Sequence, residues 1–508
     1  MQVGPETGAT PRPDANAPFH ILVLADLGGR QSRAVDDGAN LGRRMPRRID
    51  RDDFDEVMAA IAPVVRLPLA ASGAPVEIAF GELDDFHPDA LFRRVELFDR
   101  LRGLRSRLQN PATATAAIEE MTGSIGKAAP RSGDAPPQPT APTEPGPLGD
   151  GGLLESIVQQ TESEAGSAGA RSDLVDRLVD EFVTPFAIPR PDARVADLVA
   201  DVERAMTGQM RALLAAPALR QLEAAWRSLY LLVRRLETDG RLQIHVLDVT
   251  KAELRTSFAQ GPDPLQSGLA RILIDRAGGT AGGHPYAVVT SDLAIAPDEA
   301  DIELAANLAA VCAAAGTACL AAAASQWIGP SGFAVGADPD DWQCEFDAAV
   351  TAAWQALRSR QQAAFLGLVM PRYLVRQPYG SRSSPVSCLP FEEEGTEPEP
   401  AHEALPWGNA SCLVALLLAQ SWQRDHRATR LLAGDEVGDL PVHVRRSGGQ
   451  TESVPCAEVE LTSRGGERLG ELGIMPLFSV RGADAVRLGA LRPIAAGNAL
   501  LAGRWGGS

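Results

Sequence analysis

A proline-rich stretch at residues 126–152 constrains the fold of this chain more than any other feature of its sequence. The stretch, GKAAPRSGDAPPQPTAPTEPGPLGDGG, holds seven prolines and almost no large apolar side chains. Such a segment cannot bury enough apolar surface to form a core, so we expect an extended linker. It divides a first unit, residues 19–125, from a second unit, residues 153–508. Residues 1–18 are expected to form a disordered arm.

Composition and charge limit which classes of protein this chain can belong to. The 508 residues suffice for roughly two to four folded units with cores of their own. Acidic residues outnumber basic ones by 66 to 48, so no nucleic-acid partner is expected, because phosphates would be repelled. The longest apolar stretch, Leu304 to Ala324, is alanine-rich and interrupted by polar residues, which makes it a poor membrane span. The first residues show neither a basic n-region nor an apolar h-region, so we expect no Sec export. We expect a cytoplasmic protein without membrane insertion.

The first unit has the pattern of a small α/β module. The apolar run Ile21–Leu24 predicts a buried strand, and Asp50 is expected to cap a helix through RDDFDEVMAAIAP. Strands are expected at 64–69 and 75–80, followed by helical spacing over Pro88 to Leu108.

The pattern of the second unit predicts a larger α/β domain with N-terminal helices. Helices are expected in LLESIVQQTE, at 171–188 and 192–213, and in ALRQLEAAWRSLYLLVRRLE, where Leu222, Trp226 and Leu229 share one face. Interleaved helices favour a mixed, partly parallel sheet. A Ser-, Pro- and Glu-rich stretch at 379–406 is expected to be a surface insertion. The expected strands are 242–249, 271–275, 286–290, 317–322, 365–370, 441–445, 457–461 and 474–478.

Short motifs give little support for catalysis. His87-Pro88-Asp89 matches the J-domain signature but follows an acidic turn, so we expect Asp84 or Asp85 to cap a helix that Pro88 starts. The glycine-rich AGGTAGGHPY at 277–286 lacks the lysine and hydroxyl residue of a phosphate-binding loop, which favours a flexible turn.

Clusters of carboxylates and cysteines also fit no known site. The acids at 52–56 are expected in the first turn of a helix, and Glu392–Glu394 in a solvated loop, because neither run has calcium-loop spacing. Six scattered cysteines form no CxxC pair and are expected to be free or buried thiols. We expect no catalytic, metal-binding or cofactor-binding residue and no enzyme.

A family resemblance is carried by several blocks of both units. FHILVLADLGGR, RRIDRDDFDEVMAAIAP and IAFGELDDFHPDALFRR, within residues 19–111, resemble the small subunit of the type VI secretion contractile sheath. LEAAWRSLYLLV, IHVLDVTKAEL, GGTAGGHPYAVVTSDL, FLGLVMPRYLVRQPYG, PWGNASCLVALLLAQSW and GELGIMPL resemble, in order, its large subunit over residues 152–503.

The resemblance implies a structural sheath-like protomer in which small-like and large-like parts pack together. The linker would make this pairing intramolecular and raise its effective concentration. Large aromatic anchors are typical of cores and of interfaces, and we single out Trp226, Tyr230 and Trp407 as interface candidates.

The same resemblance implies partners. They are this chain itself or other sheath components, with inner-tube or baseplate proteins also possible. In the family a short helix at the start of the large subunit is gripped by an AAA+ recycling ATPase. The matching residues are Leu153, Leu154, Ile157 and Val158, whose alternative role is ordinary packing.

Two departures from the family pattern keep an alternative function open. Residues 1–18 show no strand pattern before ILVLAD, and the chain stops at Ser508, where the family continues into a C-terminal domain. Sheath polymerisation in the family depends on strand exchange through such segments. The alternative is therefore a non-polymerising adaptor, cap or assembly regulator of a sheath-like apparatus.

Overall fold

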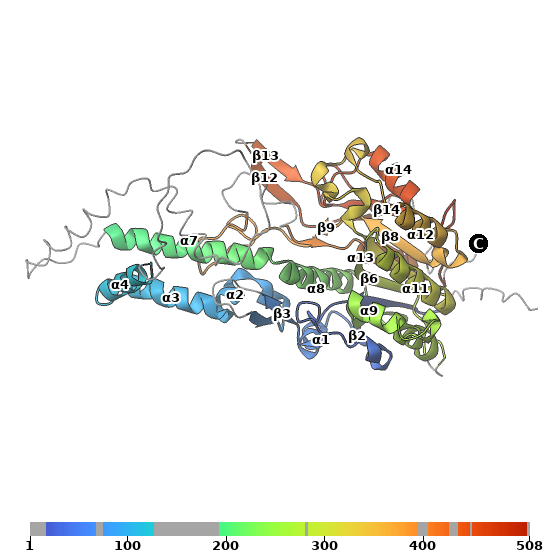
Figure 1. The fold of residues 1–508 in the computed structure, drawn as a ribbon, viewed down its shortest axis with the longest axis horizontal. Coiled ribbons are helices and arrows are strands. Elements are labelled where there is room, and N and C mark those ends of the chain that lie inside the picture. The colour runs from blue at the N-terminus through green and yellow to red at the C-terminus, as the bar shows by residue number, and fades with distance from the viewer. Residues whose placement is uncertain are drawn as a thin grey trace, which may run out of the picture.

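A nine-stranded mixed sheet forms the centre of the fold (Figure 1). The computed structural model describes residues 17–67, 75–125, 193–279, 283–394, 405–425, 435–447 and 450–504. The spatial order of the strands is β11-β15-β14-β8-β7-β6-β1-β5-β2. The strands are β1 (Phe19–Ala25), β2 (Arg47–Ile49), β5 (Leu242–Asp248), β6 (Val288–Ile295), β7 (Ala318–Ala323), β8 (Leu366–Met370), β11 (Glu436–Val437), β14 (Ile474–Ser479) and β15 (Val486–Leu488).

Strand β1 comes from before the proline-rich stretch, yet it lies inside this sheet. It pairs in parallel with β5 on one side and with β6 on the other, and all seven of its residues are buried. The β6-β7, β7-β8 and β8-β14 pairs are also parallel, whereas β2, β15 and β11 pair antiparallel near the two edges. The α/β class and the mixed sheet expected from the sequence are confirmed.

Among the residues that the structure describes, three two-stranded ladders stand outside the main sheet. The first pairs β3 with β4, the second β9 with β10 and the third β12 with β13. Their bounds are β3 (Val64–Leu67), β4 (Val76–Ala79), β9 (Tyr373–Leu374), β10 (Trp407–Gly408), β12 (His443–Ser447) and β13 (Gln450–Val454).

Helices cover both faces of the sheet. Alternation along β1 places Ile21 and Val23 in one core with α8 and α13, and Leu22 and Leu24 in a second core with α9 and α11. Figure 1 shows α3, α4 and α7 extending from one end of the sheet. The helices are α1 (Phe54–Ile61), α2 (Pro88–Arg94), α3 (Glu96–Gln109), α4 (Ala114–Ile125), α7 (Ala193–Ala215), α8 (Pro217–Arg235), α9 (Lys251–Phe258), α10 (Gly268–Ala270), α11 (Glu299–Ala315), α12 (Ala348–Arg358), α13 (Ser411–Asp425) and α14 (Ser463–Leu472).

Most expected strands are confirmed within a few residues, but two are wrong. Residues 271–276 form a π-helix, because Ser267 caps a helical turn and the buried Leu269, Ile272 and Leu273 follow helical spacing. Residues 457–461 make a single bridge, from Ala457 to Tyr373, before a loop leads into α14. No helix in the described part of the chain is both long and apolar enough to cross a membrane.

Helix starts in the first unit differ from the expectation. The helix expected from Asp50 begins at Phe54, because the Asp50 carboxylate accepts hydrogen bonds from the N–H groups of Asp52 and Asp53 in a preceding turn. The helical stretch from Pro88 breaks at Val95, which is extended and buried.

The cap of α2 also differs from the expectation. Pro88 does start the helix, but the capping side chain is His87, whose Nδ1 accepts from the Asp89 N–H. Asp85 instead joins Glu82 in a capping box around the short 3₁₀ helix Leu83–Phe86.

Candidate functional site at the junction of the two units

Backbone pairing joins the first unit to the second along the whole of β1. The register runs from Phe19 opposite Leu242 to Ala25 opposite Asp248, and β6 covers the other edge from Ile21 to Leu24. Full burial of a Leu or Ile side chain contributes roughly 1.5–3 kcal/mol, and β1 buries several. Without β1, the facing edges of β5 and β6 would have no strand between them.

An aromatic cluster lies where α8 crosses the first unit. The Trp226 indole N–H donates to the carbonyl of Leu27 over 2.9 Å, and the ring is fully buried. Phe54 of α1 packs edge-on against Trp226 and against Tyr230, with centroid distances of 5.7 and 5.2 Å. Tyr230 remains 36% exposed. Two of the three aromatic residues singled out in the sequence therefore contact the first unit.

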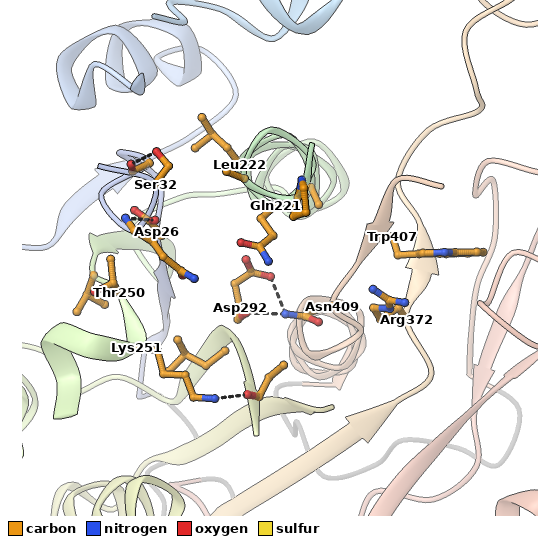
Figure 2. A pocket seen from close by; sticks show the side chains of 18 residues that line it. Asp26, Ser32, Gln221, Leu222, Thr250, Lys251, Asp292, Arg372, Trp407 and Asn409 are labelled. Atoms are coloured by element: carbon orange, nitrogen blue, oxygen red, sulfur yellow. Dashed lines mark hydrogen bonds between the residues drawn. The ribbon is translucent and has the colours of Figure 1, made fainter. Parts of the chain in front are cut away.

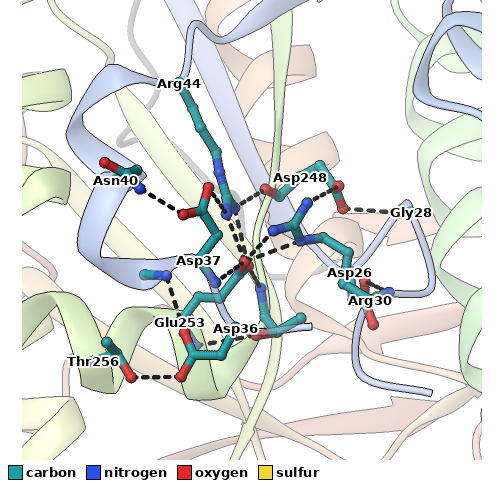
Figure 3. A network of polar contacts seen from close by, with 12 residues as sticks. Asp26, Gly28, Arg30, Asp36, Asp37, Asn40, Arg44, Asp248, Glu253 and Thr256 are labelled. Atoms are coloured by element: carbon teal, nitrogen blue, oxygen red, sulfur yellow. Dashed lines mark hydrogen bonds and ion pairs between the residues drawn. The ribbon is translucent and has the colours of Figure 1, made fainter. Parts of the chain in front are cut away.

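A buried carboxylate, Glu253, forms the centre of a polar network between the units (Figure 3). Arg30 donates to it over 2.5 and 3.0 Å, and Arg44 donates over 2.5 and 3.0 Å. Burial alone would raise the pKa of Glu253, but hydrogen bonds from Arg44, the N–H of Thr250 and Arg30 lower it to about 2. Two arginines of the first unit thus neutralise one buried acid of the second.

Two glycines in the turn after β1 allow close approaches of the backbone, Gly28 to the second unit and Gly29 to Val64 of the first unit. The Gly28 N–H donates to Asp248 Oδ1 over 2.8 Å, and a Cβ at Gly28 would lie 2.7 Å from Asp248 Oδ2. Gly29 has a φ of 67°, which side chains rarely adopt, and a Cβ there would meet the Val64 carbonyl oxygen at 2.3 Å. The turn after β1 therefore needs glycine at both positions.

The His-Pro-Asp tripeptide docks onto the loop that follows β9. The Asp89 carboxylate accepts hydrogen bonds from the N–H groups of Ser387 and Cys388 over 2.9 to 3.1 Å and from the Ser387 hydroxyl over 2.7 Å. Burial would raise the pKa of Asp89, but these hydrogen bonds hold it well below its usual value. His87 also packs edge-on against Tyr379. The tripeptide therefore helps to hold the units together.

The acidic run at 392–394 does not form the solvated loop that we expected. Glu393 binds Arg376 over 2.7 and 3.0 Å with its side chain only 11% exposed, and Arg376 also holds the buried Glu223 of α8. Burial would raise the pKa of Glu223, but Arg376 and Arg227 lower it to about 2. Glu393 is thus tied to α8 through Arg376, which binds the buried Glu223, whereas Glu392 remains exposed.

A cavity of about 540 Å³, which we call the junction pocket, opens between the two units (Figure 2). The first unit contributes Asp26, Gln31 and Ser32 just after β1, and the second contributes residues at the carboxyl ends of β5 and β6 together with the start of α8. Crevices at the carboxyl ends of parallel strands are common ligand sites in α/β proteins. Within the described residues, no three His, Cys, Asp or Glu side chains lie close enough together to hold a metal ion.

Asp292 is the titratable group in this pocket with the largest change in pKa. Asn409 donates to its carboxylate over 2.9 Å and to its backbone carbonyl over 2.5 Å. Burial raises the pKa of Asp292 to about 7, the hydrogen bond from Asn409 opposes that rise, and the nearby charge of Asp26 adds to it.

The remaining residues singled out in the sequence lie elsewhere. Trp407 packs with Leu374 and Leu405, all within the second unit, and Figure 2 shows its ring at the edge of the junction pocket, turned away from Asp292. Leu153, Leu154, Ile157 and Val158 lie outside the described residues.

Sequence reasoning missed Glu253 and the two arginines that bind it. One local signal was present, because Thr250-Lys251-Ala252-Glu253 has the spacing of a capping box, and Thr250 and Glu253 do form one at the start of α9. Nothing local could show that Arg30 and Arg44 converge on the same carboxylate.

Two protein families match the chain. Residues 196–491 match VipB, described as "EvpB/VC_A0108, tail sheath N-terminal domain". Residues 5–129 match T6SS_VipA, described as "Type VI secretion system, VipA, VC_A0107 or Hcp2". The two matches do not overlap, and the T6SS_VipA match ends within the proline-rich stretch, at residue 129.

Two relatives from Pseudomonas aeruginosa show the same division. The chain is 30% identical over 340 residues to the type VI secretion system sheath protein TssC1, covering 65% of this chain and 67% of the relative. It is 33% identical over 101 residues to the sheath protein TssB1, covering 19% of this chain and 57% of the relative. The matched part of TssB1 is therefore little more than half of that protein.

Proposed function

The chain belongs to the type VI secretion sheath family, as a structural component with small-subunit-like and large-subunit-like units in one polypeptide, and we propose that it works as a ready-paired sheath protomer. It acts through protein contacts, without a chemical step, in the cytoplasm. The proposed domains are residues 19–125 and 153–508, joined by a linker at 126–152.

One observation supports the pairing above all others. Strand β1 of the first unit lies between β5 and β6 of the second, so the sheet is continuous only when both units are present. The buried Trp226 and the Glu253 network add side-chain contacts to the same junction. A single chain delivers the two units in equal numbers and at high effective concentration.

The proposed partners are other copies of this chain or other sheath components. We further propose that Leu153, Leu154, Ile157 and Val158 form one apolar face of a helix that an AAA+ recycling ATPase can grip. Tube and baseplate proteins are the remaining proposed contacts.

Cleavage of the linker tests the pairing. A protease site placed in residues 126–152 should yield two fragments that still co-elute in size-exclusion chromatography, because the β1 contacts do not need the linker. Fragments that separate without denaturant would refute the ready-paired protomer. An uncleavable insertion of the same length serves as the control.

Electron microscopy tests the sheath role. Negative-stain images of the purified chain, alone and mixed with other sheath components, should show tubes or rings. Small particles under every condition would instead favour the adaptor, cap or assembly regulator.

A further inference from the structure

The junction pocket contains acidic side chains whose charges have no cationic side chain bound to them. Two carboxylates, Asp26 and Asp292, line it. Its two cationic lining residues are already paired, Lys251 with the buried Asp301 and Arg372 with the buried Glu458. The Asp26 oxygens accept hydrogen bonds from the backbone N–H groups of Arg30 and Gln31. Neither acid forms a salt bridge within the described residues.

The position of Asp292 is fixed by an irregularity in β6. The register between β6 and β7 shifts between Thr290 and Ala294, which frees part of the strand from regular pairing. The carbonyls of Ser291 and Asp292 there accept hydrogen bonds from the side chains of Ser411 and Asn409 at the start of α13. Irregularities of this kind are over-represented next to functional sites, where they change the direction of a side chain. Asn409 binds one carboxylate oxygen of Asp292, and within the described residues the other oxygen accepts no hydrogen bond.

Only one kind of positive group is common on this chain. Of the 48 basic residues, Lys127 and Lys251 are the only lysines, so the remaining cationic side chains are guanidinium groups. Arginine is concentrated in GRRMPRRIDR at 42–51, a segment that includes the edge strand β2 and that we call the arginine loop. Within it Arg43, Arg47 and Arg51 are exposed, and none forms a salt bridge within the described part of the structure.

We propose that the junction pocket binds the guanidinium group of an arginine from the arginine loop of a second copy of this chain. A guanidinium has five N–H donors in a plane and can bond to separated carboxylate oxygens at once. The open Asp292 oxygen, the Asp26 carboxylate and the amide oxygen of Gln221 supply acceptors around the cavity, and Figure 2 shows Gln221 extending toward Asp292. This inference rests on the proposed function as an assembling protomer and names one contact of the assembly.

The pH dependence of binding gives a second way to test whether a cation binds at Asp292. Because burial raises the pKa of Asp292 to about 7, binding of a cation should favour its charged form and release a proton near neutral pH. The charged and polar groups that face it are Asp26 after β1, Lys251 of α9, Arg372 after β8 and Asn409 before α13. Affinity should therefore rise with pH through about 7.

The first experiment tests the chemistry of the pocket on the full chain. Isothermal titration calorimetry with a peptide of the loop sequence GRRMPRRIDR should show binding that strengthens between pH 6 and pH 8. Asp292→Asn should weaken it about tenfold or more and remove the pH dependence, because a charge-assisted hydrogen bond is lost. Asp341→Asn removes the same charge from an exposed site in another part of the second unit and should leave binding unchanged. Equal binding by the Asp292→Asn protein, with unchanged melting temperature, would falsify the site.

The second experiment identifies the source of the guanidinium. Free arginine and the peptide with its arginines changed to glutamine are titrated beside the original peptide. Sedimentation velocity should show weaker self-association for Asp292→Asn and for the combined Arg43→Gln, Arg47→Gln and Arg51→Gln variant, but not for Arg382→Gln. Free arginine binding as tightly as the peptide, or self-association unchanged in the loop variant, would overturn the second-copy contact. The peptide titration does not depend on tube formation, so a failure of the sheath role is distinguishable from a failure of this site.

Discussion

Trp226 and Leu27 are 199 positions apart in the sequence, yet the indole N–H of the first donates to the backbone carbonyl of the second over 2.9 Å. The donor lies on α8 of the second unit, and the acceptor lies in the turn that follows β1. Leu27 itself is fully buried. This one contact therefore reports whether the two units are joined.

Changes at Trp226 should separate packing from hydrogen bonding. Trp226→Phe leaves the buried Leu27 carbonyl unpaired and should lower the free energy of unfolding by about 1–3 kcal/mol. Trp226→Ala also opens a cavity and should cost roughly 3–5 kcal/mol. Urea unfolding measures both. Tyr230→Phe, at a partly exposed ring, should stay within about 0.5 kcal/mol, and an equally large loss there would contradict this account.

Glu253→Gln should strongly destabilise the junction. The change leaves Arg30 and Arg44 without their common carboxylate, and removal of one partner from a buried ion pair costs about 3–5 kcal/mol. Because the arginines are partly exposed, we expect the lower end of that range. Glu460→Gln, in an exposed pair with Arg481, should cost less than about 1 kcal/mol. Similar melting temperatures for the two variants would show that the network contributes little.

Acid should weaken the junction through two histidines. Burial lowers the pKa of His20 and of His245 to about 4, and the neighbouring His284 and Arg48 act in the same direction on His20. The folded state thus holds fewer protons than the unfolded state between pH 6.5 and pH 4. Their contribution is fully present above pH 6.5 and is lost as the pH falls toward 4.

Denaturation midpoints at several pH values check this expectation. The midpoint should fall steadily from pH 7 to pH 5, and His20→Phe should flatten that fall, because an uncharged ring in β1 cannot take up a proton. A Val23→Ala variant is the control, since it weakens packing in the same strand without removing a titratable group, and its midpoint should fall with pH as in the unchanged chain. A pH profile that His20→Phe leaves unaltered would assign the acid sensitivity to other groups.

Asp89→Asn should loosen the loop that follows β9. The amide keeps one acceptor oxygen, whereas the carboxylate accepts hydrogen bonds on both oxygens from Ser387 and Cys388. Hydrogen exchange at the amides of Ser387 and Cys388 should become about tenfold faster, while exchange in β7 stays the same. Unchanged exchange at those two amides would mean that the loop is held by the Arg376 cluster alone. Asp84→Asn serves as the control, because it carries the same change in the neighbouring 3₁₀ helix.

Local patterns predicted the elements better than their partners. The stripe Leu222, Trp226 and Leu229 correctly marked the buried face of α8, and the apolar run after Phe19 correctly marked β1. The apolar run at 271–275 was misread as a strand because it is short enough to fit either structure, and only the cap at Ser267 decides for a helix. The position of β1 between β5 and β6 depends on long-range packing, to which no periodicity points.

In the candidate site, too, local sequence patterns do not show which residues come together. Charge alone suggested that Glu393 was solvated, whereas its pairing with Arg376 depends on where α8 places Glu223. Likewise the raised pKa of Asp292 follows from burial and from Asn409, far away in the sequence. Polar residues are placed by the fold that surrounds them, so their roles become visible only after the fold is known.

The central place of β1 also determines the order in which a newly made chain can fold. The ribosome makes Phe19 first, and its partner Leu242 appears only after the rest of the first unit and the proline-rich stretch have been translated. At typical elongation rates this delay is on the order of tens of seconds. During this delay the seven residues of β1, all buried in the folded protein, have no neighbouring strand to pair with. Because both partners are on one nascent chain, β5 and β6 emerge beside a strand that is already present.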